Sequence, residues 1–321
     1  MLSYVLKLFR SSILIWVISL ANTLYAQAIP INLTDGNFRN DDLLKGITAT
    51  SSECAQIERA VWAQVGTQES ACIRYWTAGF PAEANTALGK VLIYIPGDQL
   101  VAGLPEASYP TRNPKAMQEL ANSMQSRLGV PFILLSTPGT FGSSGEHSQR
   151  RRPLESKLMD SALNALKTKH HIENLAIIGL SGGGHILASL LNMRSDIVCA
   201  VLASAVTAPK LRWTSMGLNM DVTGYADSYE PIDFLDLKTF HPQLKVYVLG
   251  DLMDTNVPWH TQLPYAEKLK SLGANVELLN GTGSGPQRHA LGESGRIIGS
   301  MCLRDAPNSA IKALEKAGLK G

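Results

Sequence analysis

The sequence predicts an α/β fold, in which a mostly parallel sheet is covered by helices on both faces. Six short segments are mostly apolar, with Lys245 and Glu277 as the charged exceptions, and strands of that kind belong to parallel sheets that are buried on both sides. Segments with helical spacing alternate with them through short connections, as in right-handed crossover units. The six predicted strands are 91–95, 132–135, 175–180, 197–202, 244–249 and 276–279.

Composition and charge limit the class of protein. The chain has 321 residues, of which 45% are hydrophobic and 17% are charged, so it can bury a core and is not a disordered chain. No repeat period is visible. The net charge of +2 is too small to indicate nucleic acid as a partner.

The first 28 residues have the pattern of a secretory signal peptide. Lys7 and Arg10 precede the short apolar run 13–20, and Ala26 and Ala28 form an A-x-A cleavage pattern. The apolar run is shorter than the roughly 20 residues that span a bilayer. We therefore expect a periplasmic or secreted protein that begins near Ile29, with no stable membrane insertion after cleavage. An uncleaved membrane anchor is the alternative.

Four cysteines follow the leader, and an even number in an exported chain indicates disulfides. We predict the pairs Cys54–Cys72 and Cys199–Cys302, with four buried free thiols as the alternative. None has a neighbouring cysteine or histidine that would suggest a metal site.

One domain is predicted over residues 29–321, because no linker divides them. Residues 29–50 are polar and irregular and predict a surface arm. Residues 53–65 have helical spacing, and 72–76 alternate like an edge strand. The long excursion 205–242 is a possible small cap. Further helices are predicted around 154–166, 186–191 and 311–314.

A G-x-S-x-G motif at 179–183 marks the candidate nucleophile, Ser181. The motif by itself is weak evidence, but it lies between the most strand-like segment of the chain and a segment with helical spacing. A tight turn between strand and helix strains the residue at its apex and requires flanking glycines. The predicted helix start would favour developing negative charge near the hydroxyl.

A serine nucleophile needs a histidine base and an acid that orients it. Of seven histidines, His289 lies in a glycine-rich loop after the last strand and fits the chain order Ser, acid, His; His260 is the reserve. Asp254 and Asp251 both follow strand 244–249, and we prefer Asp254.

The oxyanion formed in acyl transfer needs preorganised donors. The backbone N–H of Gly182, directly after the nucleophile, is one candidate. The second is the N–H of Asp98 or Gln99, in the turn that begins at Pro96-Gly97.

Together these residues resemble the α/β-hydrolase superfamily over about residues 74–303, with Ser181, Asp254 and His289 in the family's order. The stretch 254–258 resembles the acid loop of the prolyl-oligopeptidase and dienelactone-hydrolase-like branch. Two departures stand out. The family's usual His-Gly is Pro96-Gly97 here, and one extra residue lies between Gly250 and the acid, which keeps Asp251 open as an alternative.

Three consecutive arginines, 150–152, precede a predicted helix, where cations oppose the helix dipole. We interpret them as a solvated basic loop; attraction of an acidic substrate group or an anionic cell-surface component is the alternative.

These features predict an exported serine hydrolase that cleaves an ester or related acyl bond of a small molecule or peptide, without metal or organic cofactor. A serine peptidase of the prolyl-oligopeptidase type and a catalytically silent binding protein are the alternatives. The sequence gives neither acyl specificity nor oligomeric state.

Overall fold

The computed structural model describes residues 28–82, 86–236 and 239–321. Nearly all of the predicted signal peptide therefore lies outside the described residues. The main strands are β3 (Ala60–Val65), β4 (Glu69–Ala78), β5 (Leu88–Ile95), β8 (Phe132–Leu135), β9 (Ile172–Leu180), β10 (Ile197–Ala203), β11 (Lys245–Gly250), β12 (Asn275–Thr282) and β13 (Leu319–Lys320).

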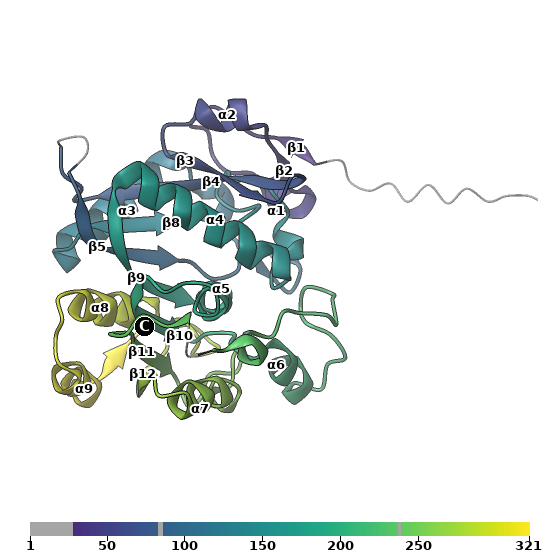
Figure 1. The fold of residues 1–321 in the computed structure, drawn as a ribbon. Coiled ribbons are helices and arrows are strands. Elements are labelled where there is room, and N and C mark those ends of the chain that lie inside the picture. The colour runs from purple at the N-terminus through teal and green to yellow at the C-terminus, as the bar shows by residue number, and fades with distance from the viewer. Residues whose placement is uncertain (1–27, 83–85, 237–238) are drawn as a thin grey trace, which may run out of the picture.

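These strands form one sheet in the order β13-β12-β11-β10-β9-β5-β8-β4-β3 (Figure 1). Strand β4 is antiparallel to both of its neighbours, whereas every pairing from β8 to β13 is parallel. The six segments predicted as buried parallel strands are the six central strands of this sheet, so the predicted α/β fold class is confirmed. Short strands pair apart from the sheet: β1 (Ile29–Pro30) with β2 (Ile47–Thr48), and β6 (Leu100–Val101) with β7 (Leu104–Pro105).

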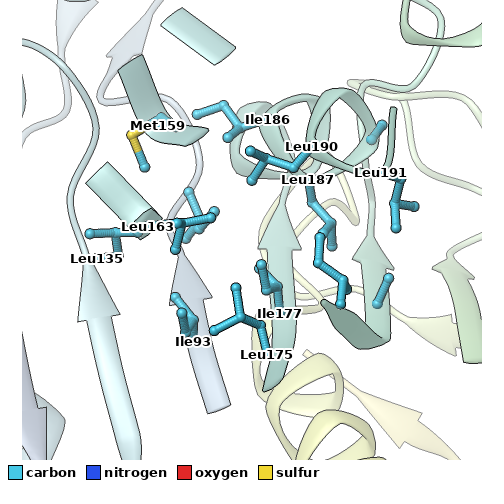
Figure 2. Packing of buried hydrophobic residues seen from close by; sticks show 14 of the residues in the cluster. Ile93, Leu135, Met159, Leu163, Leu175, Ile177, Ile186, Leu187, Leu190 and Leu191 are labelled. Atoms are coloured by element: carbon cyan, nitrogen blue, oxygen red, sulfur yellow. The ribbon is translucent and has the colours of Figure 1, made fainter. Parts of the chain in front are cut away.

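Helices cover both faces of the sheet. One face carries α4 (Pro153–His170), α5 (Gly182–Leu190) and α7 (Leu263–Ser271); the other carries α3 (Pro114–Leu128), α8 (Gly292–Leu303) and α9 (Asn308–Ala317). Figure 2 shows the first face, where Met159 and Leu163 of α4 and Leu187 of α5 lie above Ile93 and Ile177 of the sheet. The shorter helices are α1 (Asn40–Lys45), α2 (Ser51–Ala55) and α6 (Pro209–Ser215), with single 3₁₀ turns η1 (Tyr109–Thr111), η2 (His147–Gln149), η3 (Pro231–Phe234) and η5 (Trp259–Thr261).

The N-terminal part differs from the sequence prediction. The helix predicted over 53–65 is wrong beyond Ala55, because Ala60–Val65 is strand β3 and pairs with β4. The segment 72–76 is not at the edge of the sheet, since β3 covers it. The arm 29–50 contains β1, α1 and β2, and Leu43 is buried. Long-range pairing overrides local helical spacing here.

Two disulfides tie this frame together. Cys54–Cys72 joins α2 to β4, and Cys199–Cys302 joins β10 to α8. The predicted pairing is confirmed. Among the described residues, no helix has the length and apolar content that crossing a bilayer requires.

Candidate active site

Ser181 stands at the turn between β9 and α5 with φ of 53° and ψ of −115°. A positive φ is unfavourable for a serine and costs about 1–3 kcal/mol, which the surrounding structure must offset. Both motif glycines are sterically required. A Cβ at Gly179 would lie 2.3 Å from the Gly183 carbonyl oxygen, and a Cβ at Gly183 would lie 2.3 Å from that of Ile95. The turn therefore has the strained geometry expected of a nucleophile elbow.

The candidate base and acid are in direct contact. His289 Nδ1 lies 2.7 Å from Asp254 Oδ2, and the Asp254 side chain is completely buried. The other oxygen of Asp254 accepts hydrogen bonds from the N–H groups of Asn256 and Val257. An ionised Asp254 favours the tautomer in which Nδ1 carries the proton. His289 Nε2 is buried without a hydrogen-bond partner and is left as a proton acceptor.

The strand order relates these residues to Ser181. Ser181 follows β9, Asp254 follows β11 and His289 follows β12, and the parallel strands β9 to β12 are consecutive in the sheet. Their carboxyl ends meet at one edge, which is where open α/β sheets carry their sites. The assignment of the three residues as a catalytic triad stays a prediction.

Asp251, the alternative acid, has other partners. It forms an ion pair with Arg288 at 2.8 Å and accepts the N–H groups of Gly283 and Met253. These hydrogen bonds and the Arg288 guanidinium lower the pKa of Asp251, although burial alone would raise it. The carboxylate of Asp251 thus holds the residue before His289, while that of Asp254 holds the imidazole itself.

Three other histidines, His260, His185 and His147, have partners or surroundings unlike those of His289. His260, the reserve base, is exposed in η5. His185 Nε2 lies 2.9 Å from the Tyr229 carbonyl oxygen. His147 Nε2 accepts the N–H of Gln99 at 3.0 Å. Burial lowers the pKa of His147 to about 3, with help from Arg150, so its ring stays neutral and able to accept.

The N–H groups of Gly182 and Asp98 are the two oxyanion candidates. Neither has an acceptor among the described residues, whereas the N–H of Gln99, the other option, is occupied by His147. Gly182 lies against the Asp98 side chain, because a Cβ at position 182 would lie 1.9 Å from Asp98 Oδ1. Asp98 is therefore packed against the residue after the nucleophile.

Arg150 and Arg151 are part of this site, and the interpretation of 150–152 as a solvated loop is wrong for both. Arg151 Nη1 donates to Asp98 Oδ2 at 2.6 Å, and Arg150 Nε donates to the same oxygen at 2.9 Å. Arg151 Nε also donates to Asp221 Oδ2, at 2.8 Å. Burial would raise the pKa of Asp98, but the two guanidiniums hold it well below its ordinary value. Only Arg152, paired with Asp227 at the surface, fits the sequence interpretation.

No local sequence pattern could have revealed this cluster, because its partners lie 53 and 70 residues apart in the chain. The segment 205–242 contributes Asp221, and Arg212 from its helix α6 donates to the Asn256 carbonyl oxygen in the acid loop. In Figure 1, α6 and its flanking loops form a lobe beside α5 and α7. The role of this segment as a cap stays a prediction.

Comparisons with known proteins address the fold. No protein-family model and no curated protein sequence matches the chain. Acylaminoacyl peptidase from Pyrococcus horikoshii is 14% identical with a TM-score of 0.50, and the match covers 81% of this chain and 42% of the peptidase. Est1E from Butyrivibrio proteoclasticus is 13% identical with a TM-score of 0.50, covering 77% of this chain and 98% of Est1E.

A third structure, prolyl oligopeptidase B from Galerina marginata, is 12% identical with a TM-score of 0.51, and the match covers 76% of this chain and 36% of the oligopeptidase. The chain has the α/β-hydrolase fold. It spans about two fifths of the length of the acylaminoacyl peptidases that it matches. At these identities the α/β-hydrolase likeness extends to the fold alone, and the chemistry must be argued from the residues.

Among the described residues, no group of three or more His, Cys, Asp or Glu side chains is arranged to hold a metal ion.

Proposed function

We propose that this protein is an exported serine hydrolase that cleaves an ester or related acyl bond through an acyl-enzyme intermediate. The observation that carries the proposal is the 2.7 Å hydrogen bond between His289 Nδ1 and the fully buried Asp254, with Nε2 left unpartnered. The strained backbone of Ser181 at the same edge of the sheet supports it.

In the proposed mechanism, Ser181 Oγ attacks the substrate carbonyl carbon while His289 Nε2 takes the hydroxyl proton. Asp254 holds the imidazole and stabilises the imidazolium that forms. The N–H groups of Gly182 and Asp98 stabilise the oxyanion. When the tetrahedral intermediate collapses, His289 returns the proton to the leaving alcohol. Water then attacks the acyl-enzyme by the same route and releases the acid.

The decisive experiment measures hydrolysis of p-nitrophenyl acetate and butyrate by the purified protein and by Ser181→Ala. We expect kcat/KM to fall by about 10³-fold or more in the variant, because the nucleophile is removed. Ser189→Ala is a matched control, since Ser189 Oγ donates to the His185 carbonyl oxygen within its own helix. Equal turnover by wild type and Ser181→Ala would refute the proposal.

Two further assays separate the alternatives. A fluorophosphonate should label the wild type at Ser181, and the absence of an adduct would favour a catalytically silent binding protein. Parallel assays of short esters and dipeptide amides address the peptidase alternative, because faster amide cleavage would overturn the ester assignment. Export is tested by mass spectrometry of the mature chain, which should begin near Ile29.

A further inference from the structure

A cavity of about 560 Å³ lies apart from the proposed catalytic residues, none of which lines it. It is formed where four parts of the chain meet: the N-terminal segment 33–35, the loop 56–59, strand β4 and the start of α3. A volume of this size accommodates a small organic molecule.

The wall of this cavity contains a buried arginine without a charged partner. Arg74 is only 6% exposed, and its Nε is buried without a hydrogen-bond partner. Within the described part of the chain, no carboxylate lies at ion-pair distance from its guanidinium, and the exposed Asp35, which lines the same cavity, compensates its charge only in part. Burial lowers the pKa of Arg74, and the attraction of Asp35 offsets this effect only in part.

The position of Arg74 in β4 makes this unusual. Trp76 and Ala78, which lie on the same face of the strand at the two-residue period, are buried in the apolar core. An arginine at this register would be expected to reach solvent or a carboxylate. Instead its guanidinium lies 5.8 Å from the centre of the Trp76 ring, and its Nη1 would lie 3.2 Å from a Cβ at Gly142. These neighbours hold the guanidinium plane in place without neutralising it.

The rest of the lining favours an anion. The cavity includes Asn113 and Pro114 at the start of the 15-residue helix α3, whose N-terminus carries partial positive charge, and Lys115 one residue further on. Of the two acids in the lining, Glu58 pairs with Arg59 at the surface. Asp35 is exposed and remains as the single acid opposite Arg74 and Lys115.

We propose that this cavity binds a small organic anion through a carboxylate or phosphate group that pairs with the Arg74 guanidinium. The planar fork of an arginine matches two oxygens of either group, and Trp76 fixes its orientation. Lys115 and the start of α3 contribute longer-range attraction. The site is independent of the proposed hydrolase activity, because its lining contains none of the residues assigned to that chemistry.

The test is isothermal titration calorimetry of the purified full chain with sodium phosphate and with sodium citrate, with sodium chloride at equal ionic strength as the reference. We expect saturable binding of at least one of the two anions, and the two titrations distinguish phosphate from carboxylate recognition. Arg74→Gln should weaken it at least 10-fold. Lys115→Gln should weaken it about 3-fold, and Asp35→Asn should strengthen it by a similar factor, because it removes the competing charge.

Control variants separate loss of anion binding from loss of folding. Lys115 is 82% exposed, so its variant will fold even if Arg74→Gln does not. Lys270→Gln changes an exposed lysine on α7, outside the cavity, and should leave the affinity unchanged. Ser181→Ala should bind as the wild type does, which separates this site from the proposed hydrolase. Binding no stronger than that of chloride, or affinity that is unaffected by Arg74→Gln and Lys115→Gln, would overturn the proposal.

Discussion

Two buried arginines meet the cost of burial in opposite ways. Arg151 is 1% exposed and lies between the carboxylates of Asp98 and Asp221, whereas Arg74 is 6% exposed and contacts no described carboxylate. Burial lowers the pKa of both guanidiniums. For Arg151 the two carboxylates more than reverse this effect, and its pKa is raised above the ordinary value.

The different surroundings of the two arginines indicate different roles, a structural role for Arg151 and a ligand-binding role for Arg74. Arg151 already has its anions, and its charge holds together the turn that carries Asp98 and the segment 205–242. Arg74 has a cavity in place of an anion, so its charge is available to a ligand. An uncompensated buried charge costs free energy, and replacing it with an apolar side chain of similar volume is often neutral or stabilising. The comparison therefore makes opposite predictions for the two positions.

The largest effect on stability is expected for Arg151→Met. This change leaves Asp98 with Arg150 and leaves Asp221 with Arg212 at 3.5 Å, so the free energy of unfolding should fall by about 3–5 kcal/mol. Urea denaturation measures the change. The double variant Arg151→Met with Asp221→Asn should recover part of the loss, and strict additivity of the two substitutions would contradict a direct pairing.

Gly182→Ala tests the contact between Asp98 and the residue after Ser181. The new Cβ would overlap Asp98 Oδ1, so the turn that carries Asp98 must shift. We expect kcat for a short ester to fall by about 10- to 100-fold, with a loss of about 1–3 kcal/mol in stability, as in overpacked cores. In Gly89→Ala, the control, the Cβ would meet only Glu173 Oε2, at 3.9 Å. Wild-type turnover by Gly182→Ala would refute this account of the oxyanion turn.

Glu155 makes the surroundings of Arg151 sensitive to pH. Burial raises the pKa of this carboxyl from 4.5 to about 7, even though it accepts the Arg151 N–H. Because the folded-state pKa is the higher one, its stabilising contribution is complete below pH 4.5 and is lost as the pH rises through 7.

Stability relative to Glu155→Gln should therefore decrease by about 2 kcal/mol between pH 5 and pH 8. Urea denaturation of both proteins across this range measures the difference. Parallel pH profiles for the wild type and the variant would show that Glu155 does not titrate there.

The smallest effect is expected for Arg74→Met. The substitution removes a charge without stranding a partner, so stability in chloride buffer should stay within about 1 kcal/mol of the wild type or increase. A loss comparable to that of Arg151→Met would show that Arg74 has a carboxylate partner in solution and would remove the contrast between the two arginines.

The local hydrophobic pattern of the sequence is sufficient to predict the central strands of the sheet. Strands such as 91–95 and 175–180 are apolar on both faces because both faces are covered, and that property is visible residue by residue. The even number of cysteines indicates disulfides, and the two pairs that we predict among the three possible pairings are those of the structure. Residues 60–65 were misassigned as helix because their structure depends on pairing with β4, a contact that spacing does not encode.

In the candidate site, too, some features could be predicted from local sequence and others depend on tertiary contacts. A strand-to-helix glycine motif is local, so Ser181 and its strained turn could be predicted. The preference for Asp254 over Asp251 rests on its position just before Val257-Pro258 and on the resemblance of 254–258 to a family acid loop. The hydrogen bond to His289 and the ion pair of Asp251 with Arg288 are tertiary contacts. The catalytic assignment of these residues stays a prediction.

The sequence alone determined the α/β class, the strand order along the chain and the position of the candidate nucleophile, because each depends on residues within about ten positions of one another. The tertiary structure decided which charges are buried and with what. The burial of Arg150, Arg151 and Arg74 depends on segments that meet only after folding, and the charge of an arginine is the same in each environment. Whether that charge binds an internal carboxylate or faces an open cavity is set by its neighbours in space.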